Sequence, residues 1–346
     1  MGLVELIRTD IISCLEDVNL SPFCEHVFTT CSKEILSIIC NIYCFKNYFN
    51  MSMMDMSRLN RMHLPFLSKP DVLHVGLNEV REESWLEIKS LRNSFRNKIE
   101  LLENFSHEIL FENYEFQSAN IKFFEALKTY LSTYYEDGYT FKKQSIDIHL
   151  DDFSSQISLS KKTELELMSS LIPEDILILV PESENYILRN AAVFSPSNWD
   201  LKSKINKSLD IIHEPVPGYD KTLGTKVNSF LNRLPASRIF ERFNWSIYPS
   251  KNLFFHPRYP ELINETNELF LRVERQTFRK LNDSSAIMFT IGVHNYPLIE
   301  VLQIKGAPES LMSAIKIMPE SIKTYKGLDV IENAIKEEIY NYSSAK

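Results

Sequence analysis

Glycine is scarce in this chain, at 8 of 346 residues. Loops that cradle nucleotide phosphates need glycines at fixed spacing, because the backbone must approach the phosphates closely. The sequence contains no GxGxxG motif and no P-loop, and it also lacks the GxSxG nucleophile motif and the kinase signatures. These absences oppose a self-contained nicotinamide enzyme, a nucleotide hydrolase and a serine hydrolase.

Cysteine is confined to the first 44 residues, where the five cysteines form neither a CxxC pair nor a zinc-type spacing with histidine. A zinc or iron–sulfur site is therefore not expected there. An odd number of cysteines without a signal-peptide pattern is typical of a reducing compartment. The sequence predicts a cytoplasmic protein with reduced thiols.

Long apolar runs and excess basic charge are missing as well. The longest uncharged apolar run, Ile35 to Phe45, is too short to cross a bilayer. The formal net charge of -8 opposes a general nucleic-acid role, which requires a concentrated basic surface. With 44% hydrophobic and 24% charged residues, the composition is that of a packed globular protein, and we expect neither a membrane nor a nucleic-acid partner.

The apolar pattern predicts helices on both sides of a β-rich middle segment. Helical stripes begin at Trp85, running to Ile109, and at Phe124. Short apolar runs predict strands at four places: 175–180, 186–194, 243–248 and 286–293. Further helices are predicted over 198–213 with Ser197 as the N-cap, over 270–281, from Pro308, and from about Leu328.

This order of elements favours an α+β fold with an antiparallel sheet core and flanking helices. Residues 1–60 differ from the rest in their cysteines and in a cluster of methionines. We expect them to form a helical N-terminal extension, and residues 61–346 to form the main domain.

One histidine, His213, ends a predicted amphipathic helix and is followed at once by Pro215 and Pro217 in the run IIHEPVPGYD. Proline cannot continue a helix, so the imidazole is held against a stiff turn. A histidine near a helix C-terminus is most simply a cap. A fixed imidazole is also what a haem iron requires as an axial ligand. Both interpretations stay open from the local sequence, and His294, after the last predicted strand, is a weaker candidate ligand.

Three arginines, Arg272, Arg275 and Arg279, recur at intervals of three and four and would share one face of a helix. Such a stripe is usually solvated. Its alternative role is an anion clamp, because the planar guanidinium suits carboxylates and phosphates. In the run RFNWSI, Trp245 is most simply a core residue, and Asn244 is most simply a hydrogen-bond partner of a neighbouring backbone group.

Taken together and in order, several motifs resemble the haem-dependent oxidative N-demethylase alpha-subunit family. They are PSNW from Pro196, IHEPVPGYD from Ile212, RFNWSI from Arg242, LRVERQTFRKL from Leu271, AIMFTIGV from Ala286 and YKGL from Tyr325. The resemblance covers roughly residues 70 to 335. It implies a PAS-like core at about 150–300, an antiparallel sheet with helices on one face that holds haem b.

The resemblance also implies an activity: oxidative removal of a methyl group from a small amine, with O2 as co-substrate. Electrons would arrive from external flavin and iron–sulfur reductase subunits, which explains why this chain shows no flavin or nicotinamide motif. The resemblance is also compatible with a homo-oligomer of this chain. Rival functions are a non-catalytic PAS-like haem or ligand sensor and a structural subunit that has lost the haem.

The resemblance assigns roles to nine residues. His213 is the expected axial iron ligand. The other expected cofactor-binding residues are Arg242, Trp245, Arg272, Arg275 and Arg279, the last three as propionate contacts, and the expected catalytic residues are Glu214, Tyr219 and Asn244. The sequence departs from the family pattern in carrying Asn206 where a glycine is usual, and Gly292 with His294 where an arginine is expected.

Overall fold

The computed structural model describes residues 62–68, 76–91, 94–151, 153–219, 221–262 and 265–344. The chain divides into two units, Met1–Met62 and His63–Lys346. The fold and the sites below all belong to the second unit. The helical extension predicted over residues 1–60 lies outside the described residues.

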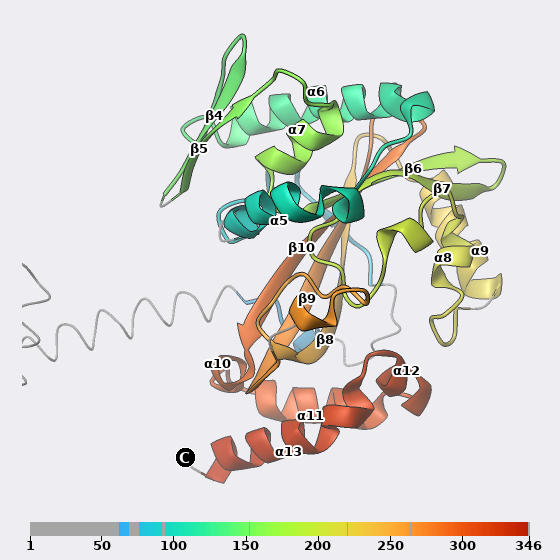
Figure 1. Ribbon diagram of the computed structural model, residues 1–346. Coiled ribbons are helices and arrows are strands. Elements are labelled where there is room, and N and C mark those ends of the chain that lie inside the picture. The colour runs from blue at the N-terminus through green and yellow to red at the C-terminus, as the bar shows by residue number, and fades with distance from the viewer. Residues whose placement is uncertain are drawn as a thin grey trace, which may run out of the picture. The chain divides into compact units, whose positions relative to one another are not determined.

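A seven-stranded sheet forms the centre of this unit, in the order β1-β8-β9-β10-β6-β7-β2 (Figure 1). Every pair of neighbouring strands is antiparallel. The strands are β1 Asn78–Val80, β2 Leu110–Phe111, β6 Asp175–Glu182, β7 Asn185–Ala192, β8 Ile239–Ser250, β9 Glu265–Lys280 and β10 Ile287–Pro297. The predicted α+β class is confirmed, and a strand lies at each of the four places where one was predicted.

The helix predicted over residues 270–281 is wrong, because this segment is strand β9. Helices cover the sheet on both faces, so a strand here carries buried residues at both parities and loses its alternating pattern. Side chains of a strand point to opposite faces in turn. Arg272 therefore faces away from Arg275 and Arg279, and the three arginines do not share a face.

The helix predicted over residues 198–213 is also largely wrong. Its first part is irregular, with a short 3-10 turn η3 at Leu201–Ser203, and only α8, Leu209–His213, is α-helical. Ser208, not Ser197, is the N-cap, and its hydroxyl accepts from the amide of Ile211. Asn206 lies between the two pieces with φ of 59°, in the left-handed region. Asparagine tolerates that region better than most residues other than glycine, which explains why it can replace the family glycine.

The face of the sheet that carries α8 is named the α8 face below. There α8 and α9, Lys221–Asn232, pack on the strands (Figure 1). Its apolar core joins residues of both helices to alternate residues of β6 and β10: Leu177, Leu179, Ile287, Leu209 and Leu231. All of these side chains are buried.

The opposite face, named the α5 face, packs against α5 Ser94–Ile109, α6 Gln117–Tyr134 and α7 Glu164–Leu171. The other parity of the same strands supplies its core, with Ile176, Ile178 and Met288 among the buried residues. Helices thus cover both faces, whereas the resemblance implied one. The helix predicted from Trp85 begins only at Ser94, and residues 88–91 form turns close to β10.

Smaller elements complete the unit. A second antiparallel sheet contains β3 Tyr139–Phe141, β4 Ser145–Leu150 and β5 Phe153–Ser158. The remaining helical elements are α4 Pro65–Ser68, η1 Glu82–Ser84, η2 Tyr114–Phe116, η4 Pro260–Leu262, α10 Leu298–Leu302, α11 Ala307–Ile317, α12 Glu320–Tyr325 and α13 Leu328–Ser344. The helices predicted from Pro308 and Leu328 are confirmed as α11 and α13.

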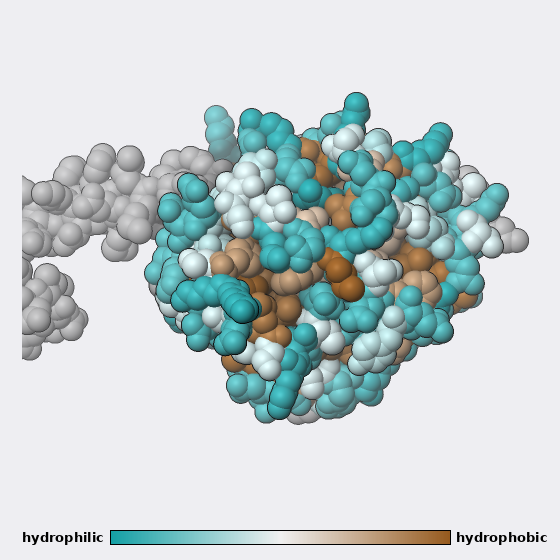
Figure 2. Space-filling model, turned by 90° about the horizontal axis from the view of Figure 1, so that it is seen from above, coloured by the Kyte–Doolittle hydropathy of each residue, from teal (hydrophilic) through white to brown (hydrophobic). Residues whose placement is uncertain are grey.

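Among the described helices, none combines the length and the apolar character needed to cross a bilayer. Figure 2 shows one side of the unit, which is largely hydrophilic with hydrophobic side chains gathered near its middle.

Lys98 joins α5 to the start of β6 from a fully enclosed position. Its side chain is only 3% exposed, and Nζ donates to the carbonyls of Ile172 at 3.0 Å and Glu174 at 2.7 Å. Nζ also lies 4.2 Å from the ring centre of Phe194. Burial lowers the pKa of Lys98 to about 8, although the charges of Asp175 and Glu174 oppose this. One buried cation therefore satisfies the carbonyls of two residues at the start of β6.

We predict that Lys98→Met keeps the shape of the stem and leaves these buried carbonyls without a donor. An unsatisfied buried polar group costs about 1–3 kcal/mol, so the free energy of unfolding should fall by roughly 3 kcal/mol. Chemical unfolding followed by circular dichroism measures this. Lys316→Met, at an exposed position of α11, is the matched control and should change stability by less than about 0.5 kcal/mol. Equal effects of the two variants would contradict the assignment.

Candidate functional site

His213 is the last residue of α8, and one of its two ring nitrogens is already engaged. Nδ1 lies 2.7 Å from the carbonyl of Leu209, which can only accept, so Nδ1 carries the proton. Nε2 makes no hydrogen bond with any described residue and keeps its lone pair. Burial lowers the pKa of His213, and the charges of Arg242 and Lys204 lower it further. A neutral imidazole with one nitrogen anchored by a carbonyl is the form in which histidine binds metals.

The turn after α8 fixes the plane of this imidazole. Tyr219 stacks on the ring of His213 with centres 4.8 Å apart and planes 21° from parallel. The Tyr219 hydroxyl donates to Asp210 at 3.2 Å, which ties the turn back to the first turn of the helix. Val216 donates its amide to the carbonyl of His213 at 2.8 Å, between the two prolines. The prolines therefore hold a closed turn over the end of α8.

Lys204 supports α8 from the irregular segment before it. Its Nζ donates at 3.0 Å to the carbonyl of Ile212, one of the carbonyls that the end of a helix leaves without a partner. Burial lowers the pKa of Lys204.

Arg242 extends from β8 on the α8 face and is poorly paired. Its Nε is enclosed and has no hydrogen-bond partner among the described residues. Burial lowers the pKa of Arg242, and the charge of Glu274 opposes this shift. The charge of Arg242 in turn lowers the pKa of both His213 and Lys326. A guanidinium with an unsatisfied N–H beside a free imidazole nitrogen is a place for an anionic group.

Glu274 is the centre of a polar cluster on the same face. It accepts from Ser197 at 2.7 Å, from Asn244 at 3.3 Å and from Gln276 at 3.0 Å. Burial raises the pKa of Glu274, but the charge of Arg272 and these hydrogen bonds outweigh it, so the pKa is lowered overall. Glu274 is therefore a half-buried carboxylate that stays ionised.

Lys326 closes this cluster from the turn before α13. Its Nζ donates to Asn244 Oδ1 at 2.8 Å and to the carbonyl of Trp245 at 2.7 Å. Burial lowers the pKa of Lys326 to about 8, against the attraction of Glu274. The cluster thus holds a cation whose proton is exchangeable close to neutral pH.

The predicted site residues fall on two faces of the sheet. The α8 face carries His213, Tyr219, Arg242, Asn244 and Arg272. Arg272 is buried there and donates to the carbonyls of Ser195 at 2.7 Å and Leu253 at 3.2 Å. Glu214 caps the end of α8 and is exposed.

The α5 face carries the other three predicted residues. Trp245 is buried against Phe66 at 5.6 Å between ring centres. Arg275 donates to Glu241 at 2.8 Å and to the carbonyl of Trp85 at 3.0 Å. Arg279 pairs with Glu82, and its guanidinium lies 4.0 Å from the centre of the Trp85 ring. The structure does not bring these three to His213.

The sequence analysis missed Glu274 and Lys326 as parts of the site. A helix over residues 270–281 with a solvated stripe of arginines gives Glu274 no place in a site. Lys326 lies in the YKGL motif about 80 residues from Asn244 in sequence, and only the packing of α12 and α13 brings the two together. Their membership in shared motifs was the one available signal.

A family model described as haem-dependent oxidative N-demethylase, alpha subunit-like, matches residues 76–336. This chain belongs to that family. The match spans every strand of the large sheet, and it includes His213, Arg242, Glu274 and Lys326. The family name connects the N-demethylase alpha-subunit-like fold with haem-dependent oxidation, and it describes one subunit of an assembly. The motifs that define the resemblance supply His213, Arg242, Glu274 and Lys326, which meet on one face.

We predict that Glu274→Gln destabilises this N-demethylase-like domain by about 1–3 kcal/mol at pH 7, because the half-buried Lys326 loses the attraction of a carboxylate and the buried Arg272 keeps only that of Asp175. The lowered pKa of Glu274 gives stability that is present above the unfolded value of 4.5 and lost as pH falls through the folded value. The difference between the two proteins should therefore shrink on acidification.

Chemical unfolding at several pH values between 7 and the acid limit of folding measures this difference. Glu268→Gln, at an exposed position of the same strand β9, is the control and should change stability by less than about 0.5 kcal/mol. A loss for Glu274→Gln that does not change with pH would show that the carboxylate charge is not its cause.

Proposed function

We propose that this chain is a haem-dependent oxidative enzyme that demethylates a small amine, with haem b bound on the α8 face. The single observation that carries the proposal is His213, a neutral imidazole fixed through Nδ1 with Nε2 available. The fit does not depend on this residue alone. Arg242 offers an unsatisfied N–H for a propionate, and aromatic side chains of the same face provide apolar surroundings, with Phe240, Phe278 and Phe289 in its core cluster.

The haem would supply oxygen activation and electron transfer, for which no side chain of this chain substitutes. The Leu209 carbonyl holds the Nδ1 proton of His213 and makes the ring more basic at Nε2. Tyr219 keeps the ring plane fixed by stacking. Arg242 would balance the charge of a propionate.

The Glu274 cluster would receive the substrate amine. A protonated secondary amine needs a carboxylate or an aromatic face. We assign this role to Glu274, oriented by Asn244, because Glu214 is exposed at the end of α8. Lys326 Nζ, with a pKa of about 8, can give up or take a proton near neutral pH. The catalytic role predicted for Glu214 stays a prediction.

A PAS-like core is part of the proposal. Its support is the order of the five long strands, β8-β9-β10-β6-β7, with α8 and α9 inserted between β7 and β8. β10, the last strand in the chain, therefore lies at the centre of these five strands. The hairpin β6-β7 pairs with one edge of β10, and β9 pairs with the other. We propose that external flavin and iron–sulfur subunits deliver electrons, in line with the alpha-subunit description of the family.

We predict that the full-length protein, expressed with haem supply, binds one haem and shows a Soret band, and that His213→Ala loses this band or binds haem at least about tenfold more weakly. The reason is that the variant removes the only nitrogen proposed as axial ligand. Optical titration with hemin measures the affinity. His149→Ala, at an exposed position of β4, is the control and should bind like the wild type.

A wild-type protein that takes up no haem would contradict the proposal and favour a subunit that has lost it. Haem bound without O2-dependent oxidation of secondary amines, in the presence of a chemical reductant, would favour the sensor. An unchanged spectrum of His213→Ala would overturn the ligand assignment.

We predict that Arg242→Met weakens haem binding by about 5- to 30-fold, because it removes one charge-assisted contact worth roughly 1–2 kcal/mol. Arg279→Met is the matched control, since Arg279 lies on the α5 face with Glu82. The same hemin titration compares them. If Arg279→Met weakened binding and Arg242→Met did not, the haem would lie on the other face of the sheet.

A further inference from the structure

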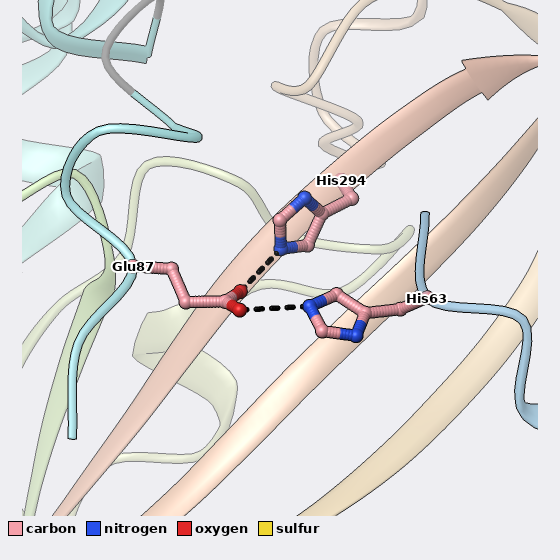
Figure 3. Close-up of side chains that lie close together, drawn as sticks. All are labelled: His63, Glu87 and His294. Carbon is pink, nitrogen blue, oxygen red and sulfur yellow. Dashed lines mark hydrogen bonds and ion pairs between the residues drawn. The ribbon is translucent and has the colours of Figure 1, made fainter. Parts of the chain in front are cut away.

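His63, Glu87 and His294 form a second cluster, on the α5 face (Figure 3). His63 Nε2 lies 2.8 Å from Glu87 Oε1, and His294 Nε2 lies 2.8 Å from Glu87 Oε2. One ligand atom of each residue lies within 4.8 Å of the others. The three residues come from separate segments: the stretch before α4, the turns after η1, and strand β10. Both imidazoles point at one carboxylate, and their ring centres lie 4.9 Å apart.

Gly292 allows this approach. A Cβ at this position of β10 would lie 2.9 Å from Leu91 Cδ1 and 3.4 Å from Glu174 Cγ. Because Gly292 has no Cβ, the turns that carry Glu87 lie directly against β10 at this position, which is two residues before His294. The Glu87 amide donates to Glu174 Oε1 at 2.7 Å, which fixes the backbone there. The Gly292 and His294 pair, unexpected for the family, thus builds the cluster.

The surroundings carry more negative than positive charge. Arg275 is the one lysine or arginine among the described residues within 4.0 Å of Glu87, and its Nε is closer to Glu241, at 2.8 Å, than to Glu87, at 3.9 Å. Burial lowers the pKa of His294 more than Glu87 raises it, so this imidazole is neutral at pH 7. Burial raises the pKa of Glu87, but the hydrogen bonds from His294 and His63 together lower it by more. The pKa of Glu87 is therefore below its usual value, and the carboxylate is ionised.

A second group of possible metal ligands in this protein is already neutralised by side-chain cations. Glu108, Asp200 and His256 are similarly close together. There, Lys202 lies 3.1 Å from Glu108 and Arg258 lies 3.1 Å from Asp200, so two side-chain cations already neutralise the carboxylates. The Glu87 carboxylate has two imidazoles in the corresponding places, and imidazoles are metal ligands where lysine and arginine are not.

We propose that His63, Glu87 and His294 bind one divalent transition-metal ion, of the class of Zn²⁺, Co²⁺ or Fe²⁺, in a site separate from that of His213. Two imidazoles and one carboxylate are a donor set for these ions, and they leave coordination positions open. Metal–ligand bonds of about 2.0–2.2 Å replace the two hydrogen bonds after small rotations of the side chains. Each ring passes its proton to Nδ1, so that both Nε2 atoms become ligands.

This site does not depend on the proposed function. Side chains of β10 alternate between faces, and His294 pairs across the sheet with Val273, on the opposite side from Glu274. A metal here therefore lies across the sheet from the α8-face cluster. Its buried position beside Arg275 and Glu241 suits a structural ion that ties the segment before α4 to the sheet, or an ion open to a small ligand through the half-buried His63.

Co²⁺ titration tests the proposal, because Co²⁺ bound to nitrogen and oxygen ligands is visible by its absorption. Tag-free full-length protein, treated with chelator and dialysed, is titrated with Co²⁺, and bound metal is counted by elemental analysis. We expect a saturable site with one Co²⁺ per chain. His63→Ala and His294→Ala should each weaken it by at least about 100-fold, since each removes a direct ligand and loss of a mere supporting contact already costs 10–100-fold.

Controls separate this site from other Co²⁺ ligands. The five cysteines of the first 44 residues can also bind Co²⁺, so the difference between variants decides, not the total uptake. His256→Ala should bind Co²⁺ like the wild type. His213→Ala should keep the Co²⁺ site whatever its effect on haem. If His63→Ala unfolds, His63→Asn replaces it, and circular dichroism monitors both.

Saturable binding that is lost in both ligand variants and kept in His256→Ala supports the proposal. The proposal is overturned if the wild type shows no stoichiometric Co²⁺ site, or if His63→Ala and His294→Ala bind with wild-type affinity. In either case the cluster is a hydrogen-bonded triad that only fixes the segment before α4.

Discussion

Coverage of the sheet on both faces is the constraint on which both sites depend. When helices pack on each side, the side chains of β8, β9 and β10 alternate between two separate interiors according to the parity of the residue number. The side chains of Arg242 and Asn244 lie on the α8 face, whereas those of Phe243 and Trp245 lie on the α5 face. A shift of one residue in register would exchange the two sets and destroy both clusters. The antiparallel pairing of β9 with both neighbours fixes that register along its length.

Buried charge is handled differently on the two faces. On the α8 face, Glu274 holds the carboxylate charge against Arg272 and Lys326, and hydrogen bonds complete its coordination. Such a network costs solvation and is kept where its geometry has a use. Arg242 Nε and Arg272 Nε have no hydrogen-bond partner among the described residues, so these two guanidinium groups are incompletely paired. On the α5 face, two imidazoles bond to one carboxylate.

His213 shows how local sequence and tertiary structure divide the work. The prolines of IIHEPVPGYD stop the helix in any context, and the sequence alone therefore placed a histidine at a stiff turn. Whether that histidine was a cap depended on its hydrogen bonds. Nδ1 bonds the Leu209 carbonyl inside α8, and Tyr219 stacks on the ring, so both contacts come from neighbours in sequence. Its neighbour Arg242 comes from a strand that follows α9.

The sequence by itself determined the α+β class, the strands at 175–180, 186–194, 243–248 and 286–293, and the family, because local apolar runs and ordered motifs carry that information. It did not determine β9 or the irregular stretch before α8. A strand covered on both faces has no alternation to detect, and a left-handed turn at Asn206 resembles a helical pattern when apolar residues flank it. The meeting of Glu274 with Lys326, and of His63 and Glu87 with His294, was decided only by tertiary structure. Such contacts join segments far apart in the chain, and their cause is the packing of helices and turns on each face of one sheet.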